Sequence, residues 1–311
     1  MRYGVPYKGS KNAIAKWIVE NLPKAEYFVD LFCGGCAVTH RALISGKWQK
    51  FIINDIDGRM PKLFLDAING KHTVENHPEW VSREEFFRLK DVDAYIAIVW
   101  SFGNNGKNYI YGADIEDFKH AYHRAVFSDD TSLLKPYGYN IRSTHKKEPY
   151  ERYLEFNRQI KEVARSDLDS IVRQIEIERL QSLQRLQSLQ SLHGDYQDVQ
   201  IPKGAVVYCD PPYSGTNCGK YEGFDSDRFH EWARAQDNVF ISEYSMPDDF
   251  IIVAETEKTV LSAANGNSQK ATERLYTNEK TYSRMTDRQK QIIALNAAQQ
   301  LTIMDFLDTE D

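Results

Sequence analysis

The chain has 311 residues, of which 41% are hydrophobic and 27% are charged, and its formal net charge is −6. This composition predicts a globular protein with one large and one smaller domain, and the net negative charge excludes a global basic field for nucleic acid. No stretch approaches the roughly 18 consecutive apolar residues of a membrane span, and the N-terminus lacks a signal-peptide core, so we expect a cytoplasmic protein without a membrane partner.

Cysteine chemistry does not dominate this sequence. The chain has four cysteines, too few for a disulfide framework in a protein of this length. Cys33 and Cys36 form a C-x-x-C pair, but Cys209 and Cys218 are badly spaced to complete a zinc site. We therefore expect no metal.

The first part of the chain alternates helix and strand signals. Residues 10–22 predict a helix that is capped by Ser10 and ends before Pro23. Residues 27–32 predict a short buried strand, which the loop C-G-G-C joins to the helical segment A-V-T-H-R-A-L-I. Residues 51–55 (F-I-I-N-D) predict the next strand. Strand, glycine loop, helix and strand in this order indicate a βαβ unit of a parallel sheet.

Strand signals return only in the last third of the chain. Residues 205–209, 238–243 and 251–256 predict three strands, with the helical segment F-H-E-W-A-R-A between the first two. Residues 80–195 are instead polar and helical, with scattered aromatic residues and a loop rich in glycine and asparagine at 101–112. This order predicts an α/β sheet that a helical insertion interrupts.

One segment has low complexity. In R-L-Q-S-L-Q-R-L-Q-S-L-Q-S-L (179–192) leucine recurs at every third position. Each step of three turns a leucine by about −60° in an α-helix, so the leucines spiral around the axis and form no single face. We expect an expanded repeat that lengthens a helix or linker; a dedicated binding element is the alternative.

The segment V-D-L-F-C-G-G-C-A (29–37) is typical of a strand whose glycine loop opens a helix. Such a turn lets the backbone approach a ligand closely and directs helix N–H groups towards it. Asp55 ends the next strand, where an acid suits hydrogen bonding to ribose hydroxyls. The loop and the acid together indicate an adenosine-containing cofactor, with NAD and S-adenosylmethionine both open at this point.

The stretch V-Y-C-D-P-P-Y-S-G (207–215) contains a second candidate site. Pro211 and Pro212 fix φ and lack N–H groups, so their carbonyls are free to accept hydrogen bonds beside the carboxylate of Asp210. Two adjacent acceptors suit an amino group with two protons to donate, and Tyr213 offers a flat face for a heterocycle. These residues predict a site for an exocyclic amine on an aromatic ring; an ordinary turn after a strand is the alternative.

Together these motifs resemble those of the Dam-like DNA adenine methyltransferases. D-P-P-Y after V-V-Y-C is similar to the catalytic motif of amino-methylating DNA methyltransferases, V-D-L-F-C-G-G to their cofactor loop, and Y-K-G-S-K (7–11) to the N-terminal motif of the Dam-like enzymes. The resemblance spans roughly residues 4–283 and includes the order of the motifs. It implies an α/β fold with a Rossmann-like methyltransferase sheet, helices on both faces, and an inserted, mainly helical DNA-recognition domain.

The resemblance also implies a division of the chain. Residues 1–75 and 196–285 would form a discontinuous catalytic domain that binds S-adenosylmethionine. Residues 76–195 would form a helical target-recognition insertion that includes 179–192, and residues 286–311 would form a tail. Double-stranded DNA is the implied partner, and we expect a monomer.

Matching positions carry over the cofactor-binding residues. Asp55 would bind the ribose hydroxyls, Ile56 would flank the adenine of the cofactor, and Tyr7 would lie beside the sulfonium-bearing end. The loop departs from the family pattern because Cys36 stands at the second glycine position, and we expect Gly35 to adopt the strained backbone conformation instead. The full implied set for cofactor binding is Tyr7, Lys11, Asp30, Phe32, Gly34, Gly35, Asp55, Ile56, Asp195, Tyr196 and Asp210.

The implied reaction is direct methyl transfer to the N6 amino group of adenine. Hydrogen bonds from this amine to Asp210 and the Pro211 carbonyl would increase the electron density on nitrogen, with Pro212 and Tyr213 completing the catalytic set. Positioning of this kind contributes about 7–11 kcal/mol towards lowering the barrier. The target adenine must leave the base stack, with Tyr213 stacking on it. No covalent intermediate is needed, so we expect Cys209 to be a core residue.

DNA recognition would fall to two polar segments of the insertion. The loop N-N-G-K-N-Y (104–109) offers amides for base edges and a lysine for phosphate. The segment K-P-Y-G-Y-N-I-R-S-T-H-K-K (135–147) mixes basic, aromatic and asparagine residues; a solvated helix face is the alternative. The candidate DNA-binding residues are Asn105, Lys107, Asn140, Arg142, Lys146 and Lys147.

Other functions stay open from the sequence. Methylation of cytosine N4 or of an RNA adenine would use the same chemistry, and a catalytically silent DNA-binding module would share the fold. An NAD-dependent oxidoreductase would explain the glycine loop but not D-P-P-Y. In the tail, Q-L-T-I-M-D-F (300–306) faintly resembles peptides that bind sliding clamps; an amphipathic terminal helix is the alternative.

Overall fold

The computed structural model describes residues 3–7, 9–73, 80–146, 148–160, 170–183, 188–212, 223–261, 268–291 and 293–294. The chain forms two compact units. The first, called the helical unit, comprises Met1–Ser10, Gly34–Ala37 and Arg59–Gln187. The second, called the sheet unit, comprises Lys11–Cys33, Val38–Gly58 and Ser188–Asp311. No helix in the described ranges is long and apolar enough to cross a membrane.

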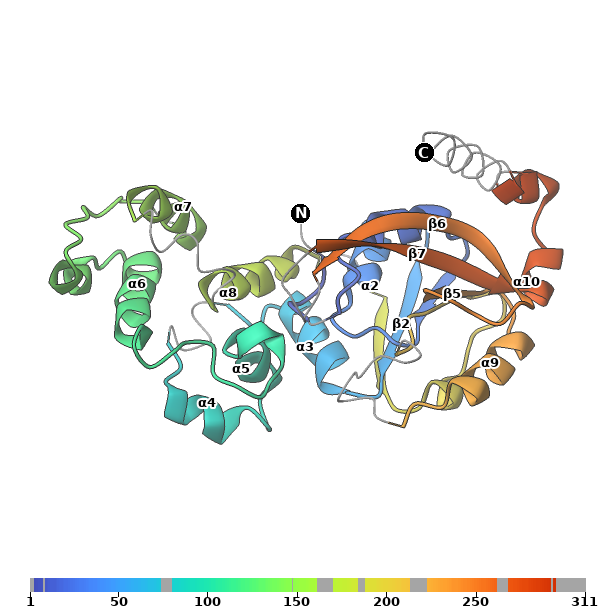
Figure 1. Cartoon of the computed structure of the whole chain (residues 1–311), viewed down its shortest axis with the longest axis horizontal. Helices are drawn as coiled ribbons and strands as arrows, with labels where there is room; N and C mark the ends of the chain where they lie inside the picture. The colour runs from blue at the N-terminus through green and yellow to red at the C-terminus, as the bar shows by residue number, and fades with distance from the viewer. Residues whose placement is uncertain are drawn as a thin grey trace, which may run out of the picture. The chain divides into compact units, whose positions relative to one another are not determined.

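The sheet unit contains one sheet of seven strands (Figure 1): β1 (Tyr27–Asp30), β2 (Lys50–Asp55), β3 (Leu189–His193), β4 (Val206–Cys209), β5 (Val239–Glu243), β6 (Phe250–Leu261) and β7 (Ser268–Asn278). Their order is β3-β2-β1-β4-β5-β7-β6. The pairs from β3 to β5 are parallel, whereas β7 is antiparallel to both β5 and β6. The order 3-2-1-4-5 is that of a doubly wound Rossmann-like sheet. The predicted fold class is therefore confirmed.

Helices cover both faces of this sheet (Figure 1). Val207, Val239 and Ile241 point to the same side of β4 and β5 because side chains alternate along a strand. They form a core with Phe229 and Ala233, which lie one helical turn apart and therefore share one face of their helix. The helices of this unit are α1 (Ala15–Asn21), α2 (Ala37–Leu43), α9 (Ser226–Ala235) and α10 (Glu279–Ser283).

Helix α1 begins later than the sequence predicted. The expected cap, Ser10, does not cap the helix: its hydroxyl has no hydrogen-bond partner, and its N–H donates to the Tyr7 carbonyl at 3.3 Å in a turn. The helix begins only at Ala15 and ends at Asn21, before Pro23 as predicted.

Strands β3 and β7 escaped the sequence analysis. The segment 179–192 was expected to lengthen a helix or linker, but its last residues form β3, an edge strand in which Leu189 is paired with Phe51 of β2. Leu192 packs against the core of the sheet unit. A leucine period of three fits neither a strand nor a helix, so pairing with β2 decides the conformation here. The expectation was wrong for these residues.

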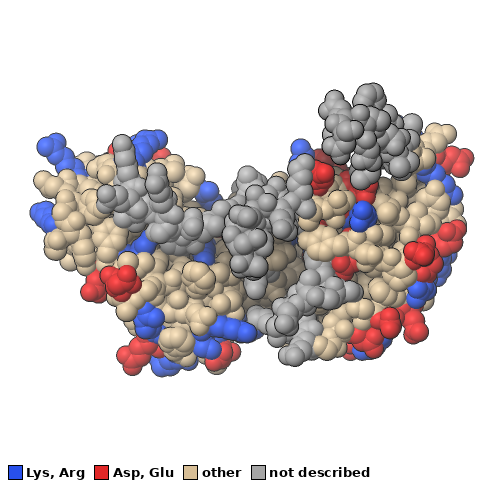
Figure 2. All heavy atoms as spheres, viewed as in Figure 1, with Lys and Arg blue, Asp and Glu red and all other residues tan. Residues whose placement is uncertain are grey.

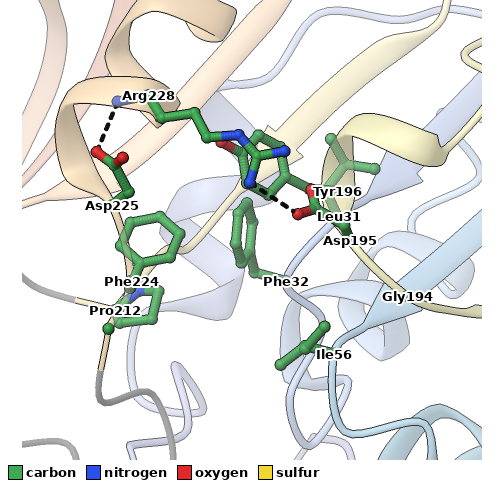
Figure 3. A pocket seen from close by; sticks show the side chains of 11 residues that line it. Leu31, Phe32, Ile56, Gly194, Asp195, Tyr196, Pro212, Phe224, Asp225 and Arg228 are labelled. Carbon is green, nitrogen blue, oxygen red and sulfur yellow. Dashed lines mark hydrogen bonds and ion pairs between the residues drawn. The ribbon is translucent and has the colours of Figure 1, made fainter.

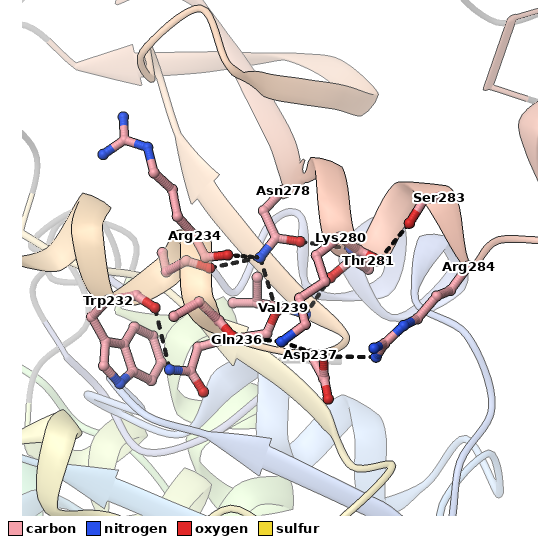
Figure 4. Close-up of polar contacts among 12 residues, drawn as sticks. Trp232, Arg234, Gln236, Asp237, Val239, Asn278, Lys280, Thr281, Ser283 and Arg284 are labelled. Carbon is pink, nitrogen blue, oxygen red and sulfur yellow. Dashed lines mark hydrogen bonds and ion pairs between the residues drawn. The ribbon is translucent and has the colours of Figure 1, made fainter.

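Asn278 joins the end of the sheet to the end of α9 (Figure 4). Its Nδ2 donates to the carbonyls of Ala233 and Gln236 at 2.7 and 2.9 Å, and its Oδ1 accepts from the Thr281 N–H at 2.7 Å. The side chain is buried. One amide group thus satisfies the last carbonyls of α9 and caps α10, which fixes α9 against the sheet.

We expect Asn278→Ala to lower the free energy of unfolding by about 1–3 kcal/mol, because buried carbonyls and an N–H lose their partners. Urea denaturation followed by circular dichroism measures the change. Lys280→Ala is the matched control, since its Nζ donates to the Ala235 carbonyl from an exposed position, and it should cost less than about 0.5 kcal/mol. Equal losses in the two variants would contradict the buried-cap argument.

The residues between β2 and β3 form most of the helical unit. A core cluster in this unit contains Tyr122, Phe156 and Ile171. A buried arginine provides a hydrogen-bond donor for carbonyls at a helix end: Arg152 donates to the Phe127 carbonyl at 2.8 Å, in the last turn of the helix Glu116–Ser128. The elements are α3 (Arg59–Ile68), α4 (Arg83–Leu89), α5 (Ala94–Val99), α6 (Glu116–Ser128), α7 (Pro149–Gln159), α8 (Ser170–Glu178) and the short 3-10 helices Phe102–Asn104, Ser132–Tyr137 and Arg179–Leu183.

Candidate active site

A cavity of about 250 Å³ lies at the carboxyl ends of the parallel strands (Figure 3). Ligands of open α/β sheets bind at this edge, where the strand order reverses between β1 and β4. Five of the residues that the sequence analysis named for the cofactor and catalytic sites line the cavity: Phe32, Ile56, Asp195, Tyr196 and Pro212. The structure therefore brings together residues from four separate stretches of the chain.

Aromatic rings form the apolar wall of the cavity. The ring of Phe32 lies 5.2 Å from that of Tyr196 and 5.9 Å from that of Phe224, and Phe229 supports both Phe32 and Tyr196 from behind at 5.6 and 5.5 Å. Ile56 is 57% exposed, which is unusual for an isoleucine and leaves its side chain available to a ligand. Rings and an exposed aliphatic side chain suit a flat heterocycle.

Asp195 and Arg228 form the polar rim. Asp195 Oδ1 accepts from the Gln197 N–H at 2.9 Å, and its Oδ2 accepts from Arg228 Nη1 at 3.2 Å. In Figure 3 the Arg228 side chain reaches across from α9 towards Tyr196 and Asp195. The sequence analysis missed Arg228 and Phe224, because neither belongs to a motif. The available signal was their position along the chain: Phe224 lies just before the helix that follows D-P-P-Y, and Arg228 lies within it.

Asp55, the predicted ribose ligand, ends β2 at the same edge of the sheet but is almost fully buried. Its Oδ1 accepts from the Asp57 N–H at 2.9 Å, and its backbone carbonyl accepts from the Gly194 N–H at 3.2 Å. The second of these bonds joins the end of β2 to the loop after β3. The ribose role of Asp55 stays a prediction.

Asp30 ends β1 and is buried against α2. Its Oδ2 accepts from Thr39 Oγ1 at 2.6 Å, which ties the start of α2 to the end of the strand across the glycine loop. Burial raises the pKa of Asp30 to about 7, and the nearby carboxylates of Asp210 and Asp55 add to the increase. Asp30 therefore links the two ends of the glycine loop, and its predicted place in the cofactor site stays a prediction.

The raised pKa of Asp30 predicts a pH dependence of stability. An aspartate in the unfolded chain ionises near pH ~4, whereas Asp30 in the folded protein has a pKa of about 7. The folded state binds more protons in this window, so the free energy of unfolding falls as the pH rises through it.

We expect the wild type to lose about 2–3 kcal/mol more than Asp30→Asn between about pH 5 and about pH 8. Urea unfolding of both proteins at the two pH values measures the difference. Asp248→Asn, which changes an exposed acid, should follow the wild type. Parallel pH curves for the wild type and Asp30→Asn would contradict the raised pKa.

The ammonium group of Lys11 is paired with the first residue of D-P-P-Y. Its Nζ lies 2.6 Å from Asp210 Oδ1 and 3.5 Å from Glu273 Oε1, and Lys11 is only 6% exposed. Burial lowers the pKa of Lys11, but the carboxylates of Asp210 and Glu273 outweigh burial and raise the pKa above its ordinary value. Lys11 therefore carries its charge at neutral pH. The two residues, 199 positions apart in sequence, were both predicted site residues.

Asp210 and the two prolines continue directly from the end of β4. Asp210 is partly exposed and Pro211 is buried.

Cys209 is fully buried, and burial raises the pKa of its thiol well above the ordinary value, which fits the predicted core residue. In the described ranges no group of three or more His, Cys, Asp or Glu is arranged to hold a metal ion. Tyr213 lies outside the described residues, so its stacking role stays a prediction.

The glycine loop packs tightly against the N-terminal segment of the helical unit. A Cβ at Gly35 would lie 2.6 Å from Tyr7 Cβ and 2.7 Å from the Val5 carbonyl oxygen, so a side chain does not fit there. The left-handed conformations lie at Gly34 (φ 44°) and Cys36 (φ 58°). The expectation that Gly35 would adopt the strained conformation was wrong. Position 35 needs glycine because a Cβ would collide with its neighbours, whereas Cys36 adopts the unfavourable positive φ.

The candidate DNA-binding residues lie on two loops of the helical unit. Lys107 is exposed at the turn after Phe102–Asn104, whereas the Asn105 Oδ1 accepts from the Lys107 and Asn108 N–H groups at 2.7 and 3.2 Å and so stabilises the loop itself. On the face shown in Figure 2, the part of the chain that carries α6 and α7 shows more lysine and arginine than acidic side chains.

Asn140, Arg142 and Lys146 are exposed on the segment between Ser132–Tyr137 and α7. Asp129 anchors this segment: its carboxylate accepts from the N–H groups of Thr144 and His145, both at 3.2 Å. Lys147 and the predicted clamp peptide at 300–306 lie outside the described residues. DNA contact by this segment stays a prediction.

The Rossmann-like strand order, together with Asp210, Pro211 and Pro212 directly after β4, is that of a methyltransferase of the amino-methylating class. Residues 7–290 match the model of the D12 class N6 adenine-specific DNA methyltransferase family, and the chain belongs to this family. The predicted family, and with it the assignment as an adenine-specific DNA methyltransferase, is therefore confirmed.

Individual similarities are distant. The chain is 23% identical over 232 residues to the Retron Ec67 DNA adenine methylase of Escherichia coli. This match covers 72% of this chain and 68% of that protein. A solved structure of a protein assigned as an RNA methyltransferase, PH1948 of Pyrococcus horikoshii, has 10% identity and a TM-score of 0.35, and the match covers 87% of this chain and 84% of that one. A TM-score this low supports no inference, and the fold assignment rests on the strand order.

Proposed function

We propose that this protein transfers a methyl group from S-adenosylmethionine to the N6 amino group of an adenine at specific sites in duplex DNA. The observation that carries the proposal is the placement of Asp210 directly after β4, ion-paired at 2.6 Å to Lys11 and followed by Pro211 and Pro212. Membership of the D12 family supports the choice of adenine N6 in DNA.

The cavity of the sheet unit fits the adenosine part of S-adenosylmethionine. Phe32 and Tyr196 offer ring surfaces and Ile56 an exposed aliphatic side chain, while Asp195 offers a carboxylate to an exocyclic amine. When bound, this cofactor supplies an electrophilic methyl group on a positively charged sulfonium. Carboxylates near this edge of the sheet complement that charge; they belong to Asp30, Asp55, Asp210 and Glu243.

Asp210 and Pro211 would bind the target amine. The Lys11 ammonium holds one oxygen of the Asp210 carboxylate and thereby orients it. The amine would donate its two N–H groups to Asp210 and to the Pro211 carbonyl, which localises the lone pair on nitrogen and directs it out of the ring plane. Formation of the new N–C bond would break the bond between the methyl carbon and sulfur, whose electron pair stays on sulfur. The nitrogen would then release one proton, for which the Asp210 carboxylate is an acceptor.

Target recognition is assigned to the helical unit. Its exposed lysine and arginine side chains at Lys107, Arg142 and Lys146 suit phosphate contacts, and the exposed amide of Asn140 suits a base edge. The reacting amine of a stacked adenine is out of reach of an enzyme pocket, so the base is expected to flip out of the duplex. That the protein acts as a monomer stays a prediction.

The test is incubation of plasmid DNA with the protein and S-adenosylmethionine, followed by single-molecule sequencing for modified bases. We expect N6-methyladenine at one short motif with the wild type and none with Asp210→Ala. Methylcytosine, or methylation of RNA alone, would show that the family chemistry acts on another target. If calorimetry shows cofactor binding but no nucleic acid is methylated, the protein is a catalytically silent binding protein.

A further inference from the structure

A second carboxylate, from a strand outside the D-P-P-Y motif, faces the Lys11–Asp210 ion pair. Glu273 lies on β7, which is hydrogen-bonded to β5, the neighbour of β4. Its side chain is 0% exposed, and its Oε1 lies 3.5 Å from Lys11 Nζ, the same atom that contacts Asp210 at 2.6 Å. The ammonium of Lys11 therefore contacts two carboxylates, one directly after β4 and one on β7.

In the β6–β7 hairpin Glu273 is paired with Thr256 across the ladder. The next residue, Arg274, forms an ion pair with Glu255 at 2.9 Å. A buried carboxylate is costly unless a partner compensates it. Lys11 is such a partner for Glu273, although it lies more than 260 positions away in sequence.

We infer that Glu273 is a positioning residue for the methyl transfer, acting through Lys11 to hold the Asp210 carboxylate where the target amine binds. This inference rests on the proposed function. With two carboxylates on one ammonium, the Lys11 side chain is held from both sides, and the Asp210 oxygen it contacts is held with it. Glu273 itself contacts neither cofactor nor substrate in this scheme.

Three carboxylates act electrostatically on Lys11: those of Asp210, Glu273 and Glu243 at the end of β5. Burial raises the pKa of Glu243 to about 7, Asp210 and Glu273 add to the increase, and Lys11 opposes it. Burial lowers the pKa of Lys11, whereas Asp210 and Glu273 raise it above the ordinary value. Removing the charge of Glu273 therefore lowers the pKa of Lys11, and the active, protonated form is lost at a lower pH.

The first experiment compares wild type with Glu273→Gln, which keeps the size and polarity of the side chain and removes its charge. We expect kcat to fall between about 10- and 100-fold, as for a displaced catalytic group. The affinity for S-adenosylmethionine, measured by calorimetry, should change less than kcat. The alkaline limb of the pH–kcat profile should move to lower pH. Glu255→Gln, which removes the charge from the partly buried ion pair with Arg274 in the same hairpin, is the matched control and should retain wild-type kcat and pH profile.

The second experiment is a double-mutant cycle with Lys11→Met. If Glu273 acts through Lys11, the charge of Glu273 has no further effect on kcat once the ammonium is absent, so Lys11→Met and Lys11→Met/Glu273→Gln should have equal kcat. The double variant also removes the buried charge that Lys11→Met leaves without its lysine partner, and it should melt at a higher temperature than Lys11→Met. This cycle decides the matter even where Glu273→Gln alone folds poorly.

Failures of the two proposals are distinguishable. A wild type that methylates no DNA overturns the proposed function. An active wild type with equal kcat and equal pH profile in Glu273→Gln overturns the positioning role. A further loss of kcat from Glu273→Gln in the Lys11→Met background would also overturn it, because the carboxylate would then act on another group.

Discussion

Asp210→Asn is expected to lower kcat for adenine methylation by about 10²–10³-fold, the usual loss when a preorganised electrostatic partner is removed from an active site. The asparagine keeps the shape of the side chain, but its neutral oxygen is a weaker acceptor for the adenine amine. It also holds the Lys11 ammonium less strongly than the wild-type carboxylate, which contacts it at 2.6 Å, because the charge is lost. Single-turnover kinetics with labelled S-adenosylmethionine on the sequenced target motif measure this loss.

Cofactor affinity separates a catalytic defect from a folding defect. Calorimetry should show that Asp210→Asn still binds S-adenosylmethionine, because the aromatic wall of the cavity comes from Phe32 and Tyr196 and not from Asp210. Asp248→Asn, at an exposed position, should behave as wild type in both assays. A variant that retains wild-type kcat would remove Asp210 from the mechanism.

Phe229→Ala is expected to lower the free energy of unfolding by about 3–5 kcal/mol, the usual effect of truncating a buried aromatic residue. Phe229 is 1% exposed and lies on α9, with its ring 5.6 Å from Phe32 and 5.5 Å from Tyr196. Because those two rings also line the cavity, their loss of support should weaken S-adenosylmethionine binding as well. Urea denaturation and calorimetry measure the two effects.

Glu231→Ala is the control for this truncation, since it changes an exposed residue on the same helix. It should alter stability by less than about 0.5 kcal/mol and leave cofactor affinity unchanged. Loss of stability in Phe229→Ala without weaker cofactor binding would show that the ring supports only the core and not the cavity.

The local parts of the site could be predicted because each motif is contiguous. Strand, glycine loop and helix follow one another at 29–37, and strand, acid and prolines follow one another at 206–212. Residues of these kinds have few conformations available, since the prolines fix φ and the Gly35 position has no room for a side chain. The family assignment followed from the order of such motifs and is confirmed over residues 7–290.

Parts that depend on distant neighbours could not be predicted. Residues 189–193 became a strand because β2 offered a free edge, although their leucine period suits neither strand nor helix. Arg228 and Phe224 joined the cavity because α9 packs beside β4, and no motif marks them. Burial, which sets the raised pKa of Asp30, is likewise invisible until the strand is covered by α2.

By itself the sequence determined the chemistry: which acid, which prolines and which glycine loop are present, and therefore which class of reaction the chain performs. The tertiary structure alone decided the electrostatics of the site, because charge interactions depend on distance and burial and not on separation along the chain. Lys11, Asp210 and Glu273 come from three distant segments, and only the pairing of β7 with β5 and the burial at the sheet edge bring their charges into contact.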